Sequence, residues 1–107
     1  MLEPLLGDVA TKVLYFLMIR EQVYAREIAD GLALSTSAVQ KQLQRLEDSG
    51  VLVSERKGTV RLYCWNPRYP FREQLRALLS RGMEFLEAAE AEKYKLRTRP
   101  RRSGKPQ

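Results

Sequence analysis

The fold is decided by residues 26–52, which read REIADGLALSTSAVQKQLQRLEDSGVL. Apolar residues recur at helical spacing on either side of a short break, which predicts a short helix and then a longer one. We expect the first helix to span residues 26–32, with Gly31 near its end, and Gly50 to end the second helix, because glycine readily adopts the left-handed conformation found at helix C-termini. Ser35 is a favourable N-cap for the second helix, since its hydroxyl can accept a hydrogen bond from the first turn. Two helices joined so tightly predict a helix-turn-helix.

The sequence on both sides of this stretch predicts one further helix at each end. Residues 8–20 have helical apolar spacing, with Asp8 as the expected N-cap. Residues 23–25 leave room for a short extended segment before the helix-turn-helix. Near the C-terminus, apolar residues recur along one broad face from residue 71 to residue 94, which predicts a single long helix.

A hairpin is predicted directly after the helix-turn-helix. Two β-rich runs, residues 51–53 and 60–65, flank the polar loop of residues 54–59, which contains a glycine. The complete order of elements predicts a mainly helical α+β fold with a small β-hairpin wing. Three helices closed by a two-stranded hairpin, with a long C-terminal helix after it, form a winged helix-turn-helix.

The charge distribution divides the chain into a domain and a tail. The net charge is +6, which favours a polyanionic partner. Residues 1–96 hold 14 basic and 13 acidic side chains, whereas residues 97–107 hold five basic side chains and no acidic one. We therefore expect one folded domain over residues 1–95 and a basic, disordered tail over residues 96–107.

The residue types present argue against catalysis and metal binding. The chain has one cysteine, Cys64, and no histidine, so the usual general bases, thiol–histidine pairs and zinc ligand sets are missing. No glycine-rich phosphate loop is present either. We expect a protein that is not an enzyme, binds no cofactor and no metal, and has a packed, unreactive Cys64. An apolar run long enough to span a bilayer is absent, and the start lacks the features of a signal peptide, which favours a cytoplasmic location without membrane contact.

Residues 26–52 resemble the winged helix-turn-helix transcription regulators of the ArsR/MarR type. The stretches Gly58-Thr59-Val60-Arg61-Leu62-Tyr63 and Asn66-Pro67 resemble the wing of that family, so the resemblance covers roughly residues 8–70. It implies a regulator that binds double-stranded DNA, and terminal helices that build a dimer. Metal-sensing relatives use a cysteine-rich motif near the recognition helix, and residues 32–42 contain no cysteine or histidine.

The helix after Ser35 has the two faces expected of a recognition helix. Val39, Leu43 and Leu46 fall on one stripe and should face the core. The opposite face carries hydroxyl, amide and cationic groups, which can read base edges and hold phosphates in a major groove. Any exposed helix is polar, so an ordinary solvated face remains the alternative. The predicted DNA-binding residues are Thr36, Ser37, Gln40, Lys41, Gln44 and Arg45 on the helix, and Arg56, Lys57 and Arg61 on the wing.

The apolar surface of the terminal helices predicts a homodimer. The helix from residue 71 has more apolar surface than one small domain would cover, and a two-fold dimer suits a palindromic operator. The alternative is that the last helix folds back on its own domain. The predicted interface consists of Leu14, Leu75, Leu78, Leu79, Gly82, Phe85 and Leu86.

These features predict a sequence-specific duplex-DNA-binding regulator, a repressor that acts as a homodimer. The alternative is a winged-helix module for protein interaction. The stretch Asn66-Pro67-Arg68-Tyr69-Pro70-Phe71 looks like that of modules that accompany nucleotidyltransferase domains. A basic surface over the recognition helix and wing would favour DNA, whereas an acidic or apolar surface would favour a protein partner.

Overall fold

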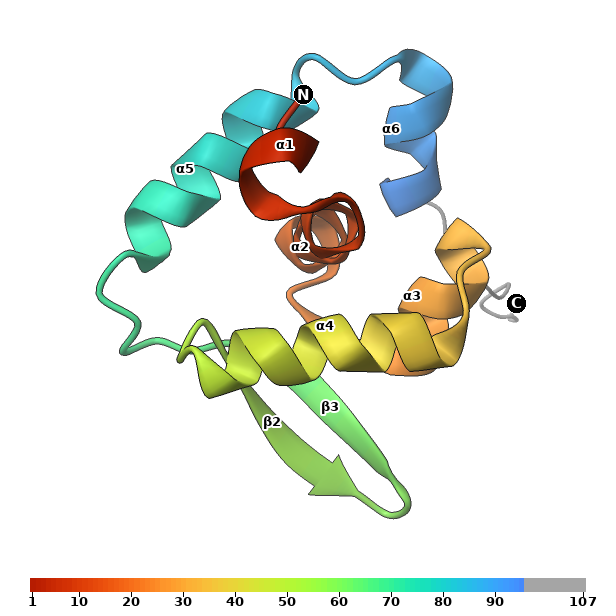
Figure 1. Cartoon of the computed structure of the whole chain (residues 1–107), viewed down its shortest axis with the longest axis vertical. Helices are drawn as coiled ribbons and strands as arrows, with labels where there is room; N and C mark the ends of the chain where they lie inside the picture. Colours follow the sequence, from red (N-terminus) through yellow and green to blue (C-terminus); the bar gives the residue numbers. More distant parts are fainter. Residues whose placement is uncertain (96–107) are drawn as a thin grey trace, which may run out of the picture.

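Helices surround a central helix, and a hairpin projects from them, in the computed structural model, which describes residues 1–95. In Figure 1, α2 lies at the centre of the view, with α5 and α6 on opposite sides of it and the β2–β3 hairpin extending away from the helices. The sheet is antiparallel, in the order β1-β3-β2. The elements are α1 Glu3–Leu6, α2 Asp8–Arg20, β1 Gln22–Tyr24, α3 Ala25–Leu32, α4 Thr36–Asp48, β2 Leu52–Lys57, β3 Val60–Trp65, α5 Arg72–Met83 and α6 Ala88–Lys95. The predicted class, mainly helical with a β-hairpin wing, is confirmed.

The two helices of the helix-turn-helix end close to where the sequence predicts, but only α4 has the predicted residues at its ends. The Ser35 hydroxyl accepts a hydrogen bond from the backbone N–H of Ala38 at 3.1 Å, which confirms the N-cap of α4. Gly50, with φ +86°, follows the end of that helix as expected. The first helix ends at Leu32, as predicted, but Gly31 is still helical, and Ala33 takes the left-handed conformation with φ +56°. Its N–H group donates to the carbonyl of Ala29, so the helix ends without a glycine.

The wing is longer than the apolar pattern indicates. Residues 54–57, predicted as loop, belong to β2, and the turn is reduced to Gly58 and Thr59. Gly58 has φ +66°, a conformation that few residues other than glycine adopt readily. A strand with solvent on both faces carries polar side chains and therefore shows no apolar alternation. The outer half of β2 is such a strand, so the sequence pattern did not predict it. The extended segment after α2 is also confirmed, since β1 pairs with β3 and places Val23 opposite Tyr63.

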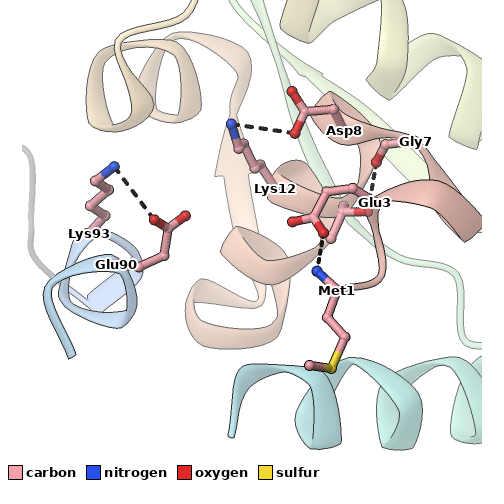
Figure 2. Close-up of polar contacts among 8 residues, drawn as sticks. Met1, Glu3, Gly7, Asp8, Lys12, Glu90 and Lys93 are labelled. Atoms are coloured by element: carbon pink, nitrogen blue, oxygen red, sulfur yellow. Dashed lines mark hydrogen bonds and ion pairs between the residues drawn. The ribbon is translucent and has the colours of Figure 1, made fainter. Parts of the chain in front are cut away.

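The core is built around α2, most of which is buried between the other helices and the sheet. Trp65 at the end of β3 joins the hairpin to this core, because its indole N–H donates to the carbonyl of Leu17 at 3.3 Å. The start of α2 differs from the prediction: Gly7 is its N-cap, and Asp8 is its first helical residue. Figure 2 shows Asp8 paired with Lys12 one turn later, with the nitrogen and oxygen 3.5 Å apart.

The C-terminal helix is broken, which corrects the prediction of one helix over residues 71–94. α5 ends at Met83, α6 starts at Ala88, and α6 lies on the other side of α2 (Figure 1). Tyr94 explains the break: it is only 1% exposed, and its ring meets Tyr15 and Phe16 edge to face, with centroids 5.4 and 5.9 Å away. A continuous helix would leave this ring in water, at a cost of a few kcal/mol. Figure 2 shows an ion pair within α6, between Lys93 and Glu90.

The predicted dimer interface is divided by this packing into two groups. Leu14, Leu79 and Gly82 are buried in the core of their own chain, so they are not available on its surface. A Cβ atom on Gly82 would lie 2.7 Å from both Leu2 and the Tyr15 hydroxyl, which shows how closely α5 crosses the N-terminal helices. The remaining four residues reach the surface of α5 and the segment after it: Leu75 and Leu86 are partly buried, and Leu78 and Phe85 are exposed.

Candidate nucleic-acid interface

A groove with a volume of about 670 Å³ lies between α4 and the wing. It contains seven of the nine residues predicted to bind DNA, and each wall comes from a different element. Its lining consists of Tyr24, Ala25, Arg26, Thr36, Ser37, Gln40, Lys41, Gln44, Arg56, Thr59, Val60, Arg61 and Tyr63. The helical periodicity of α4 and the alternation of the two wing strands thus bring residues 36–44 and residues 56–63 together.

The wall formed by α4 presents its side chains because the opposite face is fixed in the core. Val39, Leu43 and Leu46 are buried there, as predicted. Gln40 and Lys41 are exposed on the groove side. The Gln44 amide donates to the Asp48 carboxylate at 3.0 Å. An amide held in this way has its carbonyl oxygen available as an acceptor.

The wing contributes two arginines that are partners across the hairpin. Arg56 and Arg61 are opposite each other in the register of β2 and β3, so two positive charges share one cross-strand position. Their side chains bond in opposite directions along the strands. Arg56 donates to the carbonyl of Gly58 at the tip, at 3.2 Å, and Arg61 donates to the Ser54 hydroxyl towards the base, at 3.1 Å. This divergence separates two like charges that would otherwise repel.

Two predicted DNA-binding residues lie outside the groove. Side chains alternate along a strand, so Lys57 points to the face opposite Arg56, where its ammonium pairs with Glu55 at 3.5 Å. Arg45 lies farther round α4 and donates to the Gln42 side chain at 3.1 Å. Both side chains are exposed.

The groove also contains Arg26, Tyr24 and Thr59, which the sequence did not predict as binding residues. Arg26 is the second residue of α3, which was predicted as scaffold, yet β1 places the start of that helix against the groove. Its guanidinium is 3.9 Å from the Asp30 carboxylate, and both side chains are well exposed. Tyr24 is fixed at the same corner, since its backbone N–H donates to the Glu27 side chain at 2.9 Å. The sequence feature that could have identified Arg26 as a groove residue is its position directly after the extended segment predicted for residues 23–25.

The groove has one sign of charge. Four of its lining residues are cations, and none is an aspartate or glutamate. Burial raises the pKa of Tyr63, Glu47 raises it further and Arg61 lowers it, so the phenol is neutral at physiological pH and can donate a hydrogen bond. Burial also raises the pKa of the Cys64 thiol, which keeps it protonated and disfavours reaction.

Residues 1–95 contain no group of three or more histidine, cysteine, aspartate or glutamate side chains that could hold a metal ion. Within these residues, no helix is both long enough and apolar enough to span a membrane. The predicted tail, residues 96–107, lies outside the residues that the structure describes.

Comparisons with known proteins agree with this architecture. Residues 9–59 match a family model described as an HTH domain. Reduced HlyU from Vibrio cholerae has a similar structure, with a TM-score of 0.59 and 18% identity over 75% of this chain and 81% of its own. A ZitR mutant from Lactococcus lactis has a TM-score of 0.50 and 18% identity over 79% of this chain and 66% of its own. No curated protein matches in sequence. The resemblance to winged helix-turn-helix regulators is therefore confirmed in the fold: the chain contains an HTH domain and has a winged helix-turn-helix fold.

Proposed function

We propose that this protein regulates transcription by binding duplex DNA through the groove between α4 and the wing. The observation that carries the proposal is the lining of that groove, which combines four cations with hydroxyl and amide groups and includes no carboxylate. An acidic or apolar lining would have favoured a protein partner. A helix that presents such side chains fits a major groove, where amides and cations read base edges.

The groove residues divide into two roles on chemical grounds. Gln40 and Gln44 can form bidentate hydrogen bonds with adenine, and Lys41 can bind guanine. Arg56 and Arg61 lie on the wing, which in this fold runs beside the phosphate backbone, so they supply affinity rather than sequence preference. Arg26 adds a further cation at the other end of the groove. Thr36 and Ser37, in the first turn of α4, add hydroxyls near the N–H groups of a helix start, which favour an anion.

A salt titration of two neighbouring wing residues tests this assignment. Arg56 faces the groove and Lys57 faces away, yet they are adjacent cations on the same strand. Arg56→Gln should reduce the slope of log affinity against log salt by about 0.9 for the one lost phosphate contact. Binding of a labelled mixed-sequence duplex, followed by fluorescence anisotropy at several salt concentrations, measures both slopes.

Lys57→Gln is the matched control, because it removes the same charge from the other face of the wing. We expect its slope to stay near that of the unaltered protein. Equal losses in the two variants would show that charge alone matters and would reject the groove as the contact surface. A slope near zero for the unaltered protein would reject duplex DNA as the ligand.

We further propose that the protein acts as a homodimer and as a repressor. The exposed apolar side chains on and beside the outer helices support the dimer: Leu5 is 70% exposed, Leu78 37% and Phe85 54%. Large apolar side chains exposed to solvent are typical of an interface between subunits when they gather on one surface. Two identical grooves related by a two-fold axis would match a palindromic operator. Occupation of such an operator is sufficient to block a promoter, so repression requires no further site.

A further inference from the structure

A polar chain joins the end of α4 to the wing. The Ser54 hydroxyl on β2 donates to the carboxylate of Glu47 on α4 at 2.8 Å. The same oxygen accepts a hydrogen bond from the guanidinium of Arg61 on β3 at 3.1 Å. Three elements are therefore linked through one hydroxyl, which uses both its donor and an acceptor lone pair.

Glu47 is out of place by the rules that govern an isolated helix. A carboxylate in the last turn of a helix meets the negative end of the helix dipole, which is unfavourable. A carboxylate beside a DNA-binding surface also repels phosphates. The hydrogen bond from Ser54 and the nearby positive charge of Arg61 compensate for the first of these effects, because both attract the carboxylate. The residue is thus used for its contact with the wing.

The polar chain of Glu47 and Ser54 also determines where the guanidinium of Arg61 lies. Arg61 opposes Arg56 across the hairpin, and the two would compete for the same space beside the strands. Ser54 is the residue on β2 next along the same face, since it is two positions from Arg56 and side chains alternate. Its hydroxyl draws Arg61 towards α4, while Arg56 bonds at the tip. Arg56 is thereby held near the tip of the wing and Arg61 near its base.

We propose that Glu47 and Ser54 are positioning residues for DNA binding, which hold the guanidinium of Arg61 at the base of the wing. This inference rests on the proposed function and adds to it two residues that contact no DNA themselves. Without Glu47 and Ser54, the Arg61 side chain loses conformational entropy when it binds a phosphate, which lowers the affinity for DNA. With both residues present, the side chain is already held in the free protein, so binding costs less entropy.

Substitution of Glu47 is informative because its negative charge and its positioning role predict opposite changes in the affinity for DNA. Glu47→Ala removes a negative charge near the DNA surface, so simple electrostatics predicts tighter binding. The positioning role predicts weaker binding, by about three- to tenfold for a lost polar contact. Glu55→Ala is the matched control, since Glu55 lies on the same wing, facing away from the groove. The full-length protein and a labelled mixed-sequence duplex serve for all titrations, and thermal unfolding confirms that each variant is folded.

Ser54 provides the second arm. Ser54→Ala should weaken binding as Glu47→Ala does, whereas Ser54→Thr keeps the hydroxyl and should bind like the unaltered protein. In an Arg61→Gln background, Ser54→Ala should have no further effect, because the residue it positions is gone. A defect that persists in that background would reflect general loss of structure and would overturn the inference.

The outcomes separate this inference from the function on which it rests. If the unaltered protein binds duplex DNA and Glu47→Ala binds as tightly as Glu55→Ala, the positioning role is wrong and the proposed function stands. If the unaltered protein does not bind duplex DNA, both are wrong. Weaker binding by Glu47→Ala, tighter or unchanged binding by Glu55→Ala and rescue by Ser54→Thr together support the inference.

Discussion

Gln44 is the residue whose assignment to base reading is most directly testable. It lies on the groove wall of α4, and Asp48 holds its amide nitrogen, which fixes the orientation of the carbonyl oxygen. We expect Gln44→Ala to change the preferred binding site, with a loss of about 1–3 kcal/mol of discrimination for a bidentate contact. Selection from random duplexes with the parent and the variant measures this. Recovery of the same motif by both proteins would contradict a role in base reading.

Residue by residue, the sequence predicted the helical wall of the groove better than the wing. The apolar stripe of α4 determines which side chains face outwards, so Gln40, Lys41 and Gln44 could be identified from spacing alone. The face taken by Lys57 depends on how far β2 extends, and polar residues gave no indication of that length. Arg26 was missed for another reason: its own helix is a scaffold, and only the pairing of β1 with β3 brings it to the groove.

Among the helices and strands, α6 is the one whose position depends most on tertiary packing and least on its own sequence. Its placement depends on Tyr94, whose ring packs on α2. We expect Tyr94→Ala to lower the free energy of unfolding by about 3–5 kcal/mol, the usual cost of removing a buried aromatic ring. Denaturant unfolding of the full chain measures this loss. A change well below 1 kcal/mol would show that α6 contributes little to the fold.

The same tyrosine gives a pH test with the ring retained. Burial chiefly, and then Glu90, raises the pKa of Tyr94 above its ordinary value of 10.0. Below pH 10 the phenol is neutral in both states and the stability is complete; above it the unfolded chain ionises first, so stability falls as the pH rises. Tyr94→Phe should therefore show a smaller fall in unfolding free energy above pH 10. Tyr15 and Tyr63 have pKa values raised by burial as well, so part of the fall should remain.

The break between α5 and α6 shows where prediction from sequence reaches its limit. Apolar residues continue at helical spacing through residues 84–87, so local periodicity favours one helix. The competing term is tertiary, because a buried Tyr94 is available only if the chain turns back over α2. The start and the end of α4 were predicted well because Ser35 and Gly50 determine them through a side-chain hydrogen bond and a backbone angle.

For the whole molecule, the proposed dimer predicts that one charge on α5 should dissociate it. Leu78→Glu places a carboxylate in the apolar surface of the proposed interface, so the variant should sediment as a monomer while the unaltered protein sediments at twice the chain mass. Val53→Glu is the control, because Val53 is also 37% exposed but lies on the wing. We expect it to remain dimeric. A monomeric parent protein, or equal dissociation of the two variants, would contradict the proposed interface.

The opposed arginines of the wing imply a compromise between stability and function. A hairpin selected for stability alone would place a threonine or a glutamate opposite an arginine, since such pairs attract across strands and like charges repel. The protein retains Arg56 opposite Arg61, a pair that the general rule for cross-strand charges predicts to be unfavourable. An anion between the two guanidinium groups would relieve this repulsion, so the wing is electrostatically incomplete until a partner binds. Sequences evolved or designed only for thermal stability should therefore lose one of these arginines, and activity with it.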